Sequence, residues 1–164
     1  MKGKKVLIFD IDGVLVDPKI RLEQARKSKN FWKTFFDPKL METDKPIPAI
    51  IDLVKKAIKD GEEVIILTGR PEKLRNETIS QLKKLGIDIG RVKIVMRRQG
   101  DYRPSYIVKP ELLREAIGRQ NIDIEMYEDE EKVAQRYKSL YPNAKIYLVK
   151  NGKPQKMPGL LNFF

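Results

Sequence analysis

The chain has 164 residues, of which 34 are lysine or arginine and 23 are aspartate or glutamate, so its formal net charge is +11. It contains no histidine and no cysteine, which excludes Ser-His-Asp triads, thiolate nucleophiles and the usual zinc sites. Any catalyst here must use carboxylates, lysine, arginine, hydroxyls or a hard metal ion. The positive charge indicates a polyanionic partner such as nucleic acid, although a lysine- and glutamate-rich composition also occurs in heat-adapted proteins.

The length predicts one domain over residues 1–164, large enough for a hydrophobic core. The first residues lead directly into an apolar stretch that stops at Asp10, so we expect neither a signal peptide nor a membrane span. The absence of cysteine removes any disulfide framework. These features together favour a cytoplasmic protein without membrane contact.

The first predicted strand is the apolar run over residues 6–9, which ends in Asp10, Ile11, Asp12 and Gly13. Gly13 lets the backbone turn, and ligands of open α/β sheets bind at such strand ends. Two carboxylates so close repel each other unless a cation lies between them or one keeps a proton. We therefore expect Asp10 to raise the pKa of Asp12. The pair predicts a magnesium site, a nucleophile with a neighbouring acid, or both.

A lysine-rich segment, residues 18–46, follows and predicts a small helical insert, with one helix and then a proline-punctuated loop. Its aromatic residues are Phe31, Trp32, Phe35 and Phe36. We expect these rings to dock the insert against the body of the domain. The alternative is that they stack on nucleic-acid bases.

Beyond the insert, strand and helix patterns alternate. Apolar β-rich runs predict strands at 64–67, 92–95, 122–127 and 146–149, and helical spacing predicts helices at 47–58, 74–85, 111–117 and 133–140. The third of these helices is expected to begin at Pro110. The alternation predicts an α/β fold: a parallel sheet of about five strands with helices on both faces. The tail, residues 150–164, has little periodicity, and its apolar end either packs on the core or binds a partner.

The second strand is followed by Thr68, Gly69 and Arg70. The Thr68 hydroxyl and the adjacent backbone N–H groups can hold a phosphate oxygen where we expect a helix to begin, at Pro71. Arg70 can add a bidentate contact. Taken alone, such a turn is common and has a purely structural interpretation.

Two further groups are candidates because of their places beside predicted elements. The Lys109 ammonium can reach a phosphate and a nucleophile together, although a lone lysine is usually a surface group. Glu128 and Asp129 follow the strand over residues 122–127. Acidic residues also suit the first turn of a helix, but these two lie at the strand tip, where that interpretation explains them less well.

In this order the four elements resemble the haloacid dehalogenase (HAD) superfamily, whose pattern is a DxD strand end, a Thr or Ser strand end, a lysine and an acidic pair. The matching residues are Asp10-Ile11-Asp12-Gly13, Thr68, Lys109 and Glu128-Asp129. The resemblance implies a Rossmann-like HAD fold with a short insert in the cap position. It also implies a magnesium-dependent phosphatase, a phosphoric monoester hydrolase that forms an aspartyl phosphate.

The resemblance assigns a role to each matching residue. Asp10 corresponds to the nucleophile, and Asp12 to the acid–base group that protonates the leaving oxygen and then activates water. Thr68 corresponds to the phosphate-binding hydroxyl, with Gly69 beside it in the same turn. Lys109 corresponds to the lysine that neutralises charge.

The resemblance also implies a set of magnesium ligands. These are the Asp10 carboxylate, the Asp12 backbone carbonyl and an acidic residue from the pair at the end of the strand over residues 122–127. The family often has Asp-Asp or Gly-Asp there, whereas this chain has Glu128-Asp129. Which of these two contacts the metal is left open.

A closer resemblance is to the phosphatase domain of polynucleotide kinase-phosphatases, especially the phage type. It rests on Leu67-Thr68-Gly69-Arg70-Pro71-Glu72 with Arg75, Thr78 and Leu82, on Met96-Arg97, Asp101 and Lys109, and on Tyr127-Glu128-Asp129 with Val133 and Tyr137. It implies removal of a 3′-phosphate from a DNA or RNA end during nucleic-acid repair, with Arg70 and Arg97 as further substrate-binding groups.

Two other functions fit the same sequence. A HAD phosphatase acting on a nucleotide or a sugar phosphate would share every catalytic group. A non-catalytic nucleic-acid-binding module would use the basic surface but would not need a nucleophile. The insert is short for a lid, and an open site admits a chain end, so we favour the polynucleotide substrate.

Overall fold

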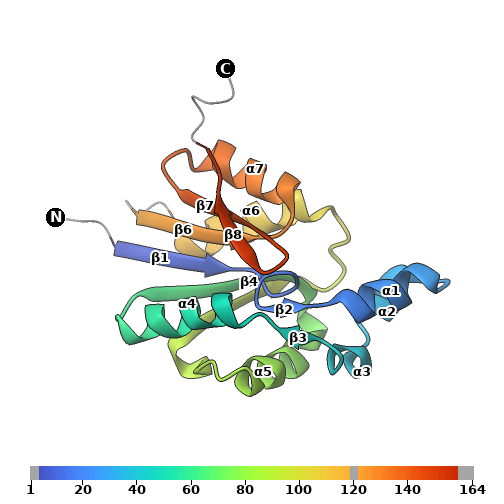
Figure 1. The fold of residues 1–164 in the computed structure, drawn as a ribbon. Helices are drawn as coiled ribbons and strands as arrows, with labels where there is room; N and C mark the ends of the chain where they lie inside the picture. The colour runs from blue at the N-terminus through green and yellow to red at the C-terminus, as the bar shows by residue number, and fades with distance from the viewer. Residues whose placement is uncertain (1–3, 119–121, 159–164) are drawn as a thin grey trace.

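The computed structural model describes residues 4–118 and 122–158 and is built around a six-stranded sheet in the order β5-β4-β1-β6-β7-β8 (Figure 1). The parallel strands are β1 (Lys4–Phe9), β4 (Glu63–Pro71), β5 (Val92–Arg97), β6 (Ile122–Glu128) and β7 (Lys145–Lys150), and the antiparallel strand is β8 (Lys153–Lys156). All five predicted strands are therefore present, and the predicted parallel sheet is confirmed.

The strand order places β1 in the middle, hydrogen-bonded to β4 on one side and to β6 on the other. In this register Ile8 pairs with both Ile65 and Met126. Because the three strands are parallel, their carboxyl ends reach the same edge of the sheet. The residues that follow β1, β4 and β6 are far apart in the sequence but neighbours in space.

Helices cover both faces of the sheet, as predicted (Figure 1). On one face, α4 (Pro48–Lys59) and α5 (Arg75–Lys84) pack against strand residues such as Leu7. On the other face, α6 (Ser105–Ile117) and α7 (Glu131–Leu140) pack against strand residues of the opposite parity. Successive residues of a buried strand face opposite layers, so both parities are apolar in these strands.

The insert is more structured than expected. It contains three short helices, α1 (Lys19–Lys27), α2 (Phe31–Phe35) and α3 (Pro38–Met41), instead of one helix and a loop. A two-stranded antiparallel sheet of β2 (Val16–Asp17) and β3 (Lys45–Pro46) closes its base. The side chains of Asn30 and Asp37 accept backbone hydrogen bonds at the starts of α2 and α3, which lets such short helices begin.

Two predicted helix starts were wrong. Helix α6 begins at Ser105, after Pro104, and Pro110 lies inside it. Pro110 is the sixth residue of α6, beyond the first turn, so its missing N–H removes one hydrogen bond from the helix interior. Helix α5 begins at Arg75 instead of Pro71, since β4 continues to Pro71 and a 3₁₀ turn over Glu72–Leu74 precedes the helix.

The tail contributes one strand that the sequence pattern did not predict. Every residue of β8 is exposed, so the strand has no apolar alternation to reveal it. The apolar residues Leu160, Leu161, Phe163 and Phe164 lie outside the described residues. Within residues 4–118 and 122–158, no helix is long and apolar enough to cross a membrane.

Candidate active site

Asp10 lies directly past β1 and is 5% exposed. One carboxylate oxygen, Oδ1, accepts a hydrogen bond from the Ile11 backbone N–H at 2.8 Å, and Oδ2 accepts one from Lys109 Nζ at 2.9 Å. The Asp10 N–H donates to the Tyr127 carbonyl at 3.1 Å. Backbone and side chain are therefore both held, and the orientation of this carboxylate is fixed.

Lys109 connects Asp10 to Glu128. Its ammonium donates to Asp10 Oδ2 at 2.9 Å and to Glu128 Oε1 at 2.7 Å, and only 2% of the lysine is exposed. The other Glu128 oxygen accepts from the backbone N–H groups of Asp129 and Glu130 at 2.8 and 3.1 Å. Each oxygen of Glu128 thus has a partner within the protein. The sequence placed Lys109 before a helix, but it lies within α6 and points to the ends of β1 and β6.

Asp129 differs from Glu128 because its buried Oδ1 has no hydrogen-bond partner among the described residues. Its carboxylate packs against Gly13, where a Cβ would come within 2.2 Å of Asp129 Oδ2. Gly13 has a φ of 83°, which also favours glycine. Oxygen atoms of Asp10, Glu128 and Asp129 lie within 4.8 Å of one another. An unpartnered carboxylate oxygen in an all-oxygen cluster fits a hard cation such as Mg²⁺.

The electrostatics of this cluster are dominated by burial and like charge. Burial, together with Glu128 and Asp12, raises the pKa of Asp10 well above its usual range despite the Lys109 charge. Burial and the charges of Asp10 and Glu128 raise the pKa of Asp129 to about 11. Burial lowers the pKa of Lys109, but Asp10 and Glu128 outweigh it and keep the ammonium charged. One lysine therefore faces three carboxyl groups, and a divalent cation would relieve their repulsion.

Asp12 faces a different environment. Arg70 donates from Nη2 to Asp12 Oδ1 at 2.8 Å and from Nε to Oδ2 at 3.1 Å, and Arg21 also donates to Oδ1. Burial acts to raise the pKa of Asp12, but the charges and hydrogen bonds of Arg70 and Arg21 hold that pKa below its usual range. The expectation that Asp10 would raise it was wrong, because two buried guanidinium groups outweigh one carboxylate.

Arg70 and Arg97 have protein partners where the sequence predicted a phosphate. Arg70 is fully buried against Asp12. Arg97 donates to the carbonyls of Gly69, Asp101 and Arg103 at 2.9, 3.0 and 2.6 Å, and to Ser105 Oγ at 3.0 Å. Arg70 therefore orients Asp12, and Arg97 holds the last residues of β4 to the start of α6.

Thr68 and Gly69 lie near the end of β4, and Gly69 is close to Lys109. Thr68 is buried, and its Oγ1 accepts the Arg70 N–H at 3.1 Å. A Cβ on Gly69 would lie 3.8 Å from the Lys109 Cε atom. The pairing of β4 with β5 shifts register between Thr68 and Pro71, which turns this backbone out of the ladder. The structure thus brings the carboxyl ends of β1, β4 and β6 together, with Lys109 in contact with Asp10 and Glu128 and close to Gly69.

Comparison with known proteins shows to which family this arrangement of residues belongs. Residues 4–152 match the family described as the polynucleotide kinase PNKP phosphatase domain. The chain belongs to this family. A HAD-type phosphatase is therefore both the fold and the enzyme class of the chain. A comparison with curated protein sequences gives no match.

Solved structures agree with the family. A chain of the structure titled "Structure of Pnkp1/Rnl/Hen1 complex" is 25% identical with a TM-score of 0.70, over 93% of this chain and 48% of that one. The present chain thus spans about half of that chain's length. At 16% identity, the tungstate-bound class C acid phosphatase from Bacillus anthracis (TM-score 0.57, 81% of this chain and 54% of that one) and phosphoserine phosphatase in apo form (TM-score 0.54, 87% and 84%) share the fold.

The PNKP-type site includes two groups that the sequence analysis missed. Arg21 donates from Nε to Asp44 Oδ1 at 2.7 Å and from Nη2 to Asp44 Oδ2 at 2.8 Å, as well as to Asp12. Gln81 Nε2 donates to Asp44 Oδ2 at 2.8 Å. Arg21 is one cation among many in the lysine-rich insert, and Asp44 lies in an apparently irregular stretch, so no local pattern marks either residue.

The contribution of the buried Asp12–Arg70 ion pair to stability can be measured by removing Arg70. We expect Arg70→Met to lower the free energy of unfolding by about 3–5 kcal/mol at pH 7, because it leaves a buried carboxylate without its bidentate partner. Arg103→Met is the matched control, since Arg103 also makes bidentate contacts with carboxylates, those of Asp101 and Glu111, but at the surface. Urea unfolding followed by circular dichroism measures both. Equal losses of unfolding free energy in the two variants would contradict the role of Arg70 as the buried partner of Asp12.

Proposed function

We propose that this phosphatase is a magnesium-dependent phosphomonoesterase that removes a 3′-phosphate from a polynucleotide end through an aspartyl phosphate on Asp10. The observation that supports it most is the fixed Asp10 carboxylate, which lies against one buried ammonium and beside an unpartnered Asp129 oxygen. A phosphate dianion repels a carboxylate nucleophile, so the site must neutralise charge before the two can meet. Lys109 and a cation at Asp129 would do so.

The chemistry divides into two displacements at phosphorus. An Asp10 oxygen attacks the phosphorus atom in line with the leaving 3′-oxygen, and the bond from phosphorus to that oxygen breaks. A water molecule then attacks the same phosphorus atom and breaks its bond to Asp10. Inorganic phosphate and the free carboxylate are the products. Lys109 stays protonated throughout and balances the charge on the phosphoryl oxygens, with Thr68 and the Gly69 backbone beside it.

Asp12 is the proposed acid and base. It would give a proton to the leaving 3′-oxygen in the first displacement and take one from the water in the second. Arg70 and Arg21 favour its charged form, which suits the second role. A bound phosphate dianion adds negative charge beside Asp12 and favours the protonated form that the first role needs. The two arginines therefore orient this carboxylate while the substrate sets its charge.

The proposed magnesium ligands are the carboxylates of Asp10 and Asp129 together with the Asp12 backbone carbonyl. Glu128 is less suited to the metal, because Lys109 and two backbone N–H groups already occupy its oxygens. When bound, the cation would supply positive charge to the phosphoryl oxygens. Within the acidic pair, we therefore assign metal binding to Asp129 and the positioning of Lys109 to Glu128.

A polynucleotide end is the substrate that the family and the charge favour. The net charge of +11 attracts a phosphate backbone, and the family is the phosphatase domain of polynucleotide kinases. A similar chain, 25% identical, is found in a second solved structure, "Structure of the Pnkp1/Rnl/Hen1 RNA repair complex", whose name refers to RNA repair. We extend that role to this chain as a proposal, with repair proteins as its partners.

The nucleophile is tested by Asp10→Asn, which keeps the size of the side chain but removes its nucleophilic charge. We expect phosphate release from a 3′-phosphorylated oligonucleotide to fall on the order of 10⁴-fold or more, and the circular dichroism spectrum to stay unchanged. Asp52→Asn, an exposed change on α4, is the matched control and should keep full activity. Full activity of Asp10→Asn would exclude the covalent mechanism.

The same assay decides the substrate class. A 3′-phosphorylated oligonucleotide, its 5′-phosphorylated isomer, a 3′-mononucleotide and a sugar phosphate are compared with magnesium present. Equal or faster turnover of the small compounds would replace the polynucleotide with a small-molecule substrate.

The metal assignment predicts different effects for the two acidic neighbours. Asp129→Asn should weaken Mg²⁺ binding at least about tenfold, because it removes a ligand charge that has no other partner. Glu128→Gln should weaken it less, because that side chain acts on Lys109. Isothermal titration calorimetry of magnesium chloride into each variant measures this without reference to turnover. A larger loss in Glu128→Gln would reverse the assignment.

A further inference from the structure

We propose that the exposed side of the insert is a subsite for the single strand that carries the 3′-phosphate, with Trp32 stacking on one of its bases. This subsite rests on the proposed function, because it requires a polynucleotide substrate. We call it the insert platform and define it by four aromatic residues and three lysines: Phe31, Trp32, Phe35, Phe36, Lys27, Lys29 and Lys33.

The aromatic part of the platform is only partly packed on the core, where Phe36 lies against the buried side chains of Met41, Leu74 and Met96. Helix α2 reads Phe-Trp-Lys-Thr-Phe, yet none of its residues is buried. Trp32 stacks on Phe36 with ring centroids 5.6 Å apart and meets Phe31 edge-on at 4.8 Å. Even so, 62% of Trp32 is exposed. The rings thus support one another, and most of the indole surface faces solvent, where a base can stack on it.

The sequence predicted that these aromatic residues dock the insert on the body of the domain, and only some of them do so. The Phe35 ring packs under the Arg21 guanidinium, whose carbon lies 4.7 Å from the ring centroid. This contact fixes one side of α2 to the domain. Trp32 takes no part in it and remains on the exposed side of the cluster.

The charge around Trp32 is uncompensated. Lys27, Lys29 and Lys33 are exposed, and none of them forms a salt bridge within the described part of the chain. On the neighbouring β5–α6 loop, by contrast, Arg98 and Arg103 both have acidic partners. An exposed aromatic ring beside free positive charge is the combination by which proteins bind single strands without reading their sequence.

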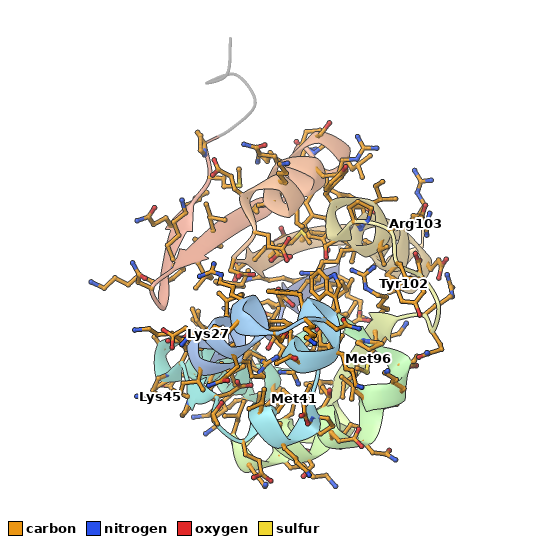
Figure 2. The ribbon with its side chains drawn as sticks, turned by 90° about the vertical axis from the view of Figure 1, so that its right-hand side faces the viewer. Lys27, Met41, Lys45, Met96, Tyr102 and Arg103 are labelled. Atoms are coloured by element: carbon orange, nitrogen blue, oxygen red, sulfur yellow. The ribbon has the colours of Figure 1, made fainter. Side chains whose placement is uncertain are left out.

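The platform is joined to the catalytic groups through a single side chain. Arg21 donates to Asp12 and also, at 2.9 Å, to the carbonyl of Phe35 in α2. In Figure 1, α1 and α2 project beyond the end of the sheet to which the β1 arrow points. In Figure 2, Lys27 is labelled at the left of the view, and Tyr102 and Arg103 are labelled at the right. A strand whose terminal phosphate lies at Asp10 can therefore continue along the platform.

Trp32 provides its own probe, because it is the only tryptophan in the chain. The wild-type protein is titrated with a single-stranded 3′-hydroxyl oligonucleotide, the reaction product, while its intrinsic fluorescence is recorded. An abasic oligomer of the same length and charge is the control. We expect quenching by the oligonucleotide and much weaker quenching by the abasic chain, because only bases stack on the indole.

Kinetic measurements on variants separate a loss of base stacking from a loss of activity toward every substrate. In Trp32→Ala, the ratio of kcat/KM for a 3′-phosphorylated oligonucleotide to kcat/KM for p-nitrophenyl phosphate should fall about tenfold, mainly through KM. Trp32→Phe should recover part of this ratio. The double variant Lys29→Gln/Lys33→Gln should lower the salt dependence of oligonucleotide turnover, whereas the matched Lys153→Gln/Lys156→Gln pair on the exposed strand β8 should lower it less.

Three results would overturn the platform while leaving the proposed function in place. These are turnover of oligonucleotides with no tryptophan quenching, equal quenching by the abasic chain, and an unchanged substrate ratio in Trp32→Ala. In that event the apolar patch belongs to a protein contact. Turnover of p-nitrophenyl phosphate with none of any oligonucleotide would instead reject the proposed function, and the platform with it.

Discussion

The site depends on the burial of three carboxyl groups against one ammonium at the carboxyl edge of the sheet. Asp10, Glu128 and Asp129 approach one another there, and Lys109 forms salt bridges with Asp10 and Glu128 but not with Asp129. Such a cluster is costly without a cation, and the raised pKa of Asp129 is a measure of that cost. We propose that the same crowding prepares the site for a metal ion and a phosphoryl group, whose opposite charges would complete it.

The two aspartates of the first motif do different work because the fold gives them different neighbours. Asp10 is held by Lys109 on one side of the strand end, and Asp12 is held by Arg70 and Arg21 on the other. Arg21 comes from the insert, so its hydrogen bond to Asp12 connects the insert directly to the candidate site. The Arg21 guanidinium links Asp12, the proposed acid–base group, to the aromatic surface where we place the substrate strand.

Sequence patterns predicted the sheet, because each buried strand is a continuous apolar run, and they predicted Asp10, Thr68 and Glu128 at strand ends. Alternating strands and helices imply that parallel ends meet, so their convergence also followed. The pairing of Arg21 with both Asp12 and Asp44 could not be predicted, since no local periodicity connects these three residues. The position of Lys109 inside α6 was hidden by Pro110, which normally marks a helix start. The exposed strand β8 had no apolar pattern at all.

The proposed mechanism requires Asp10 to be the nucleophile that accepts the phosphoryl group. The enzyme is mixed with a 3′-phosphorylated oligonucleotide and magnesium, quenched in acid during turnover and reduced with borohydride, which converts an acyl phosphate to an alcohol. Mass spectrometry of the peptides then locates the reduced residue. We expect homoserine at position 10, dependent on both substrate and magnesium. Reduction at Asp12, or no reduction at any aspartate while phosphate is being released, would contradict it.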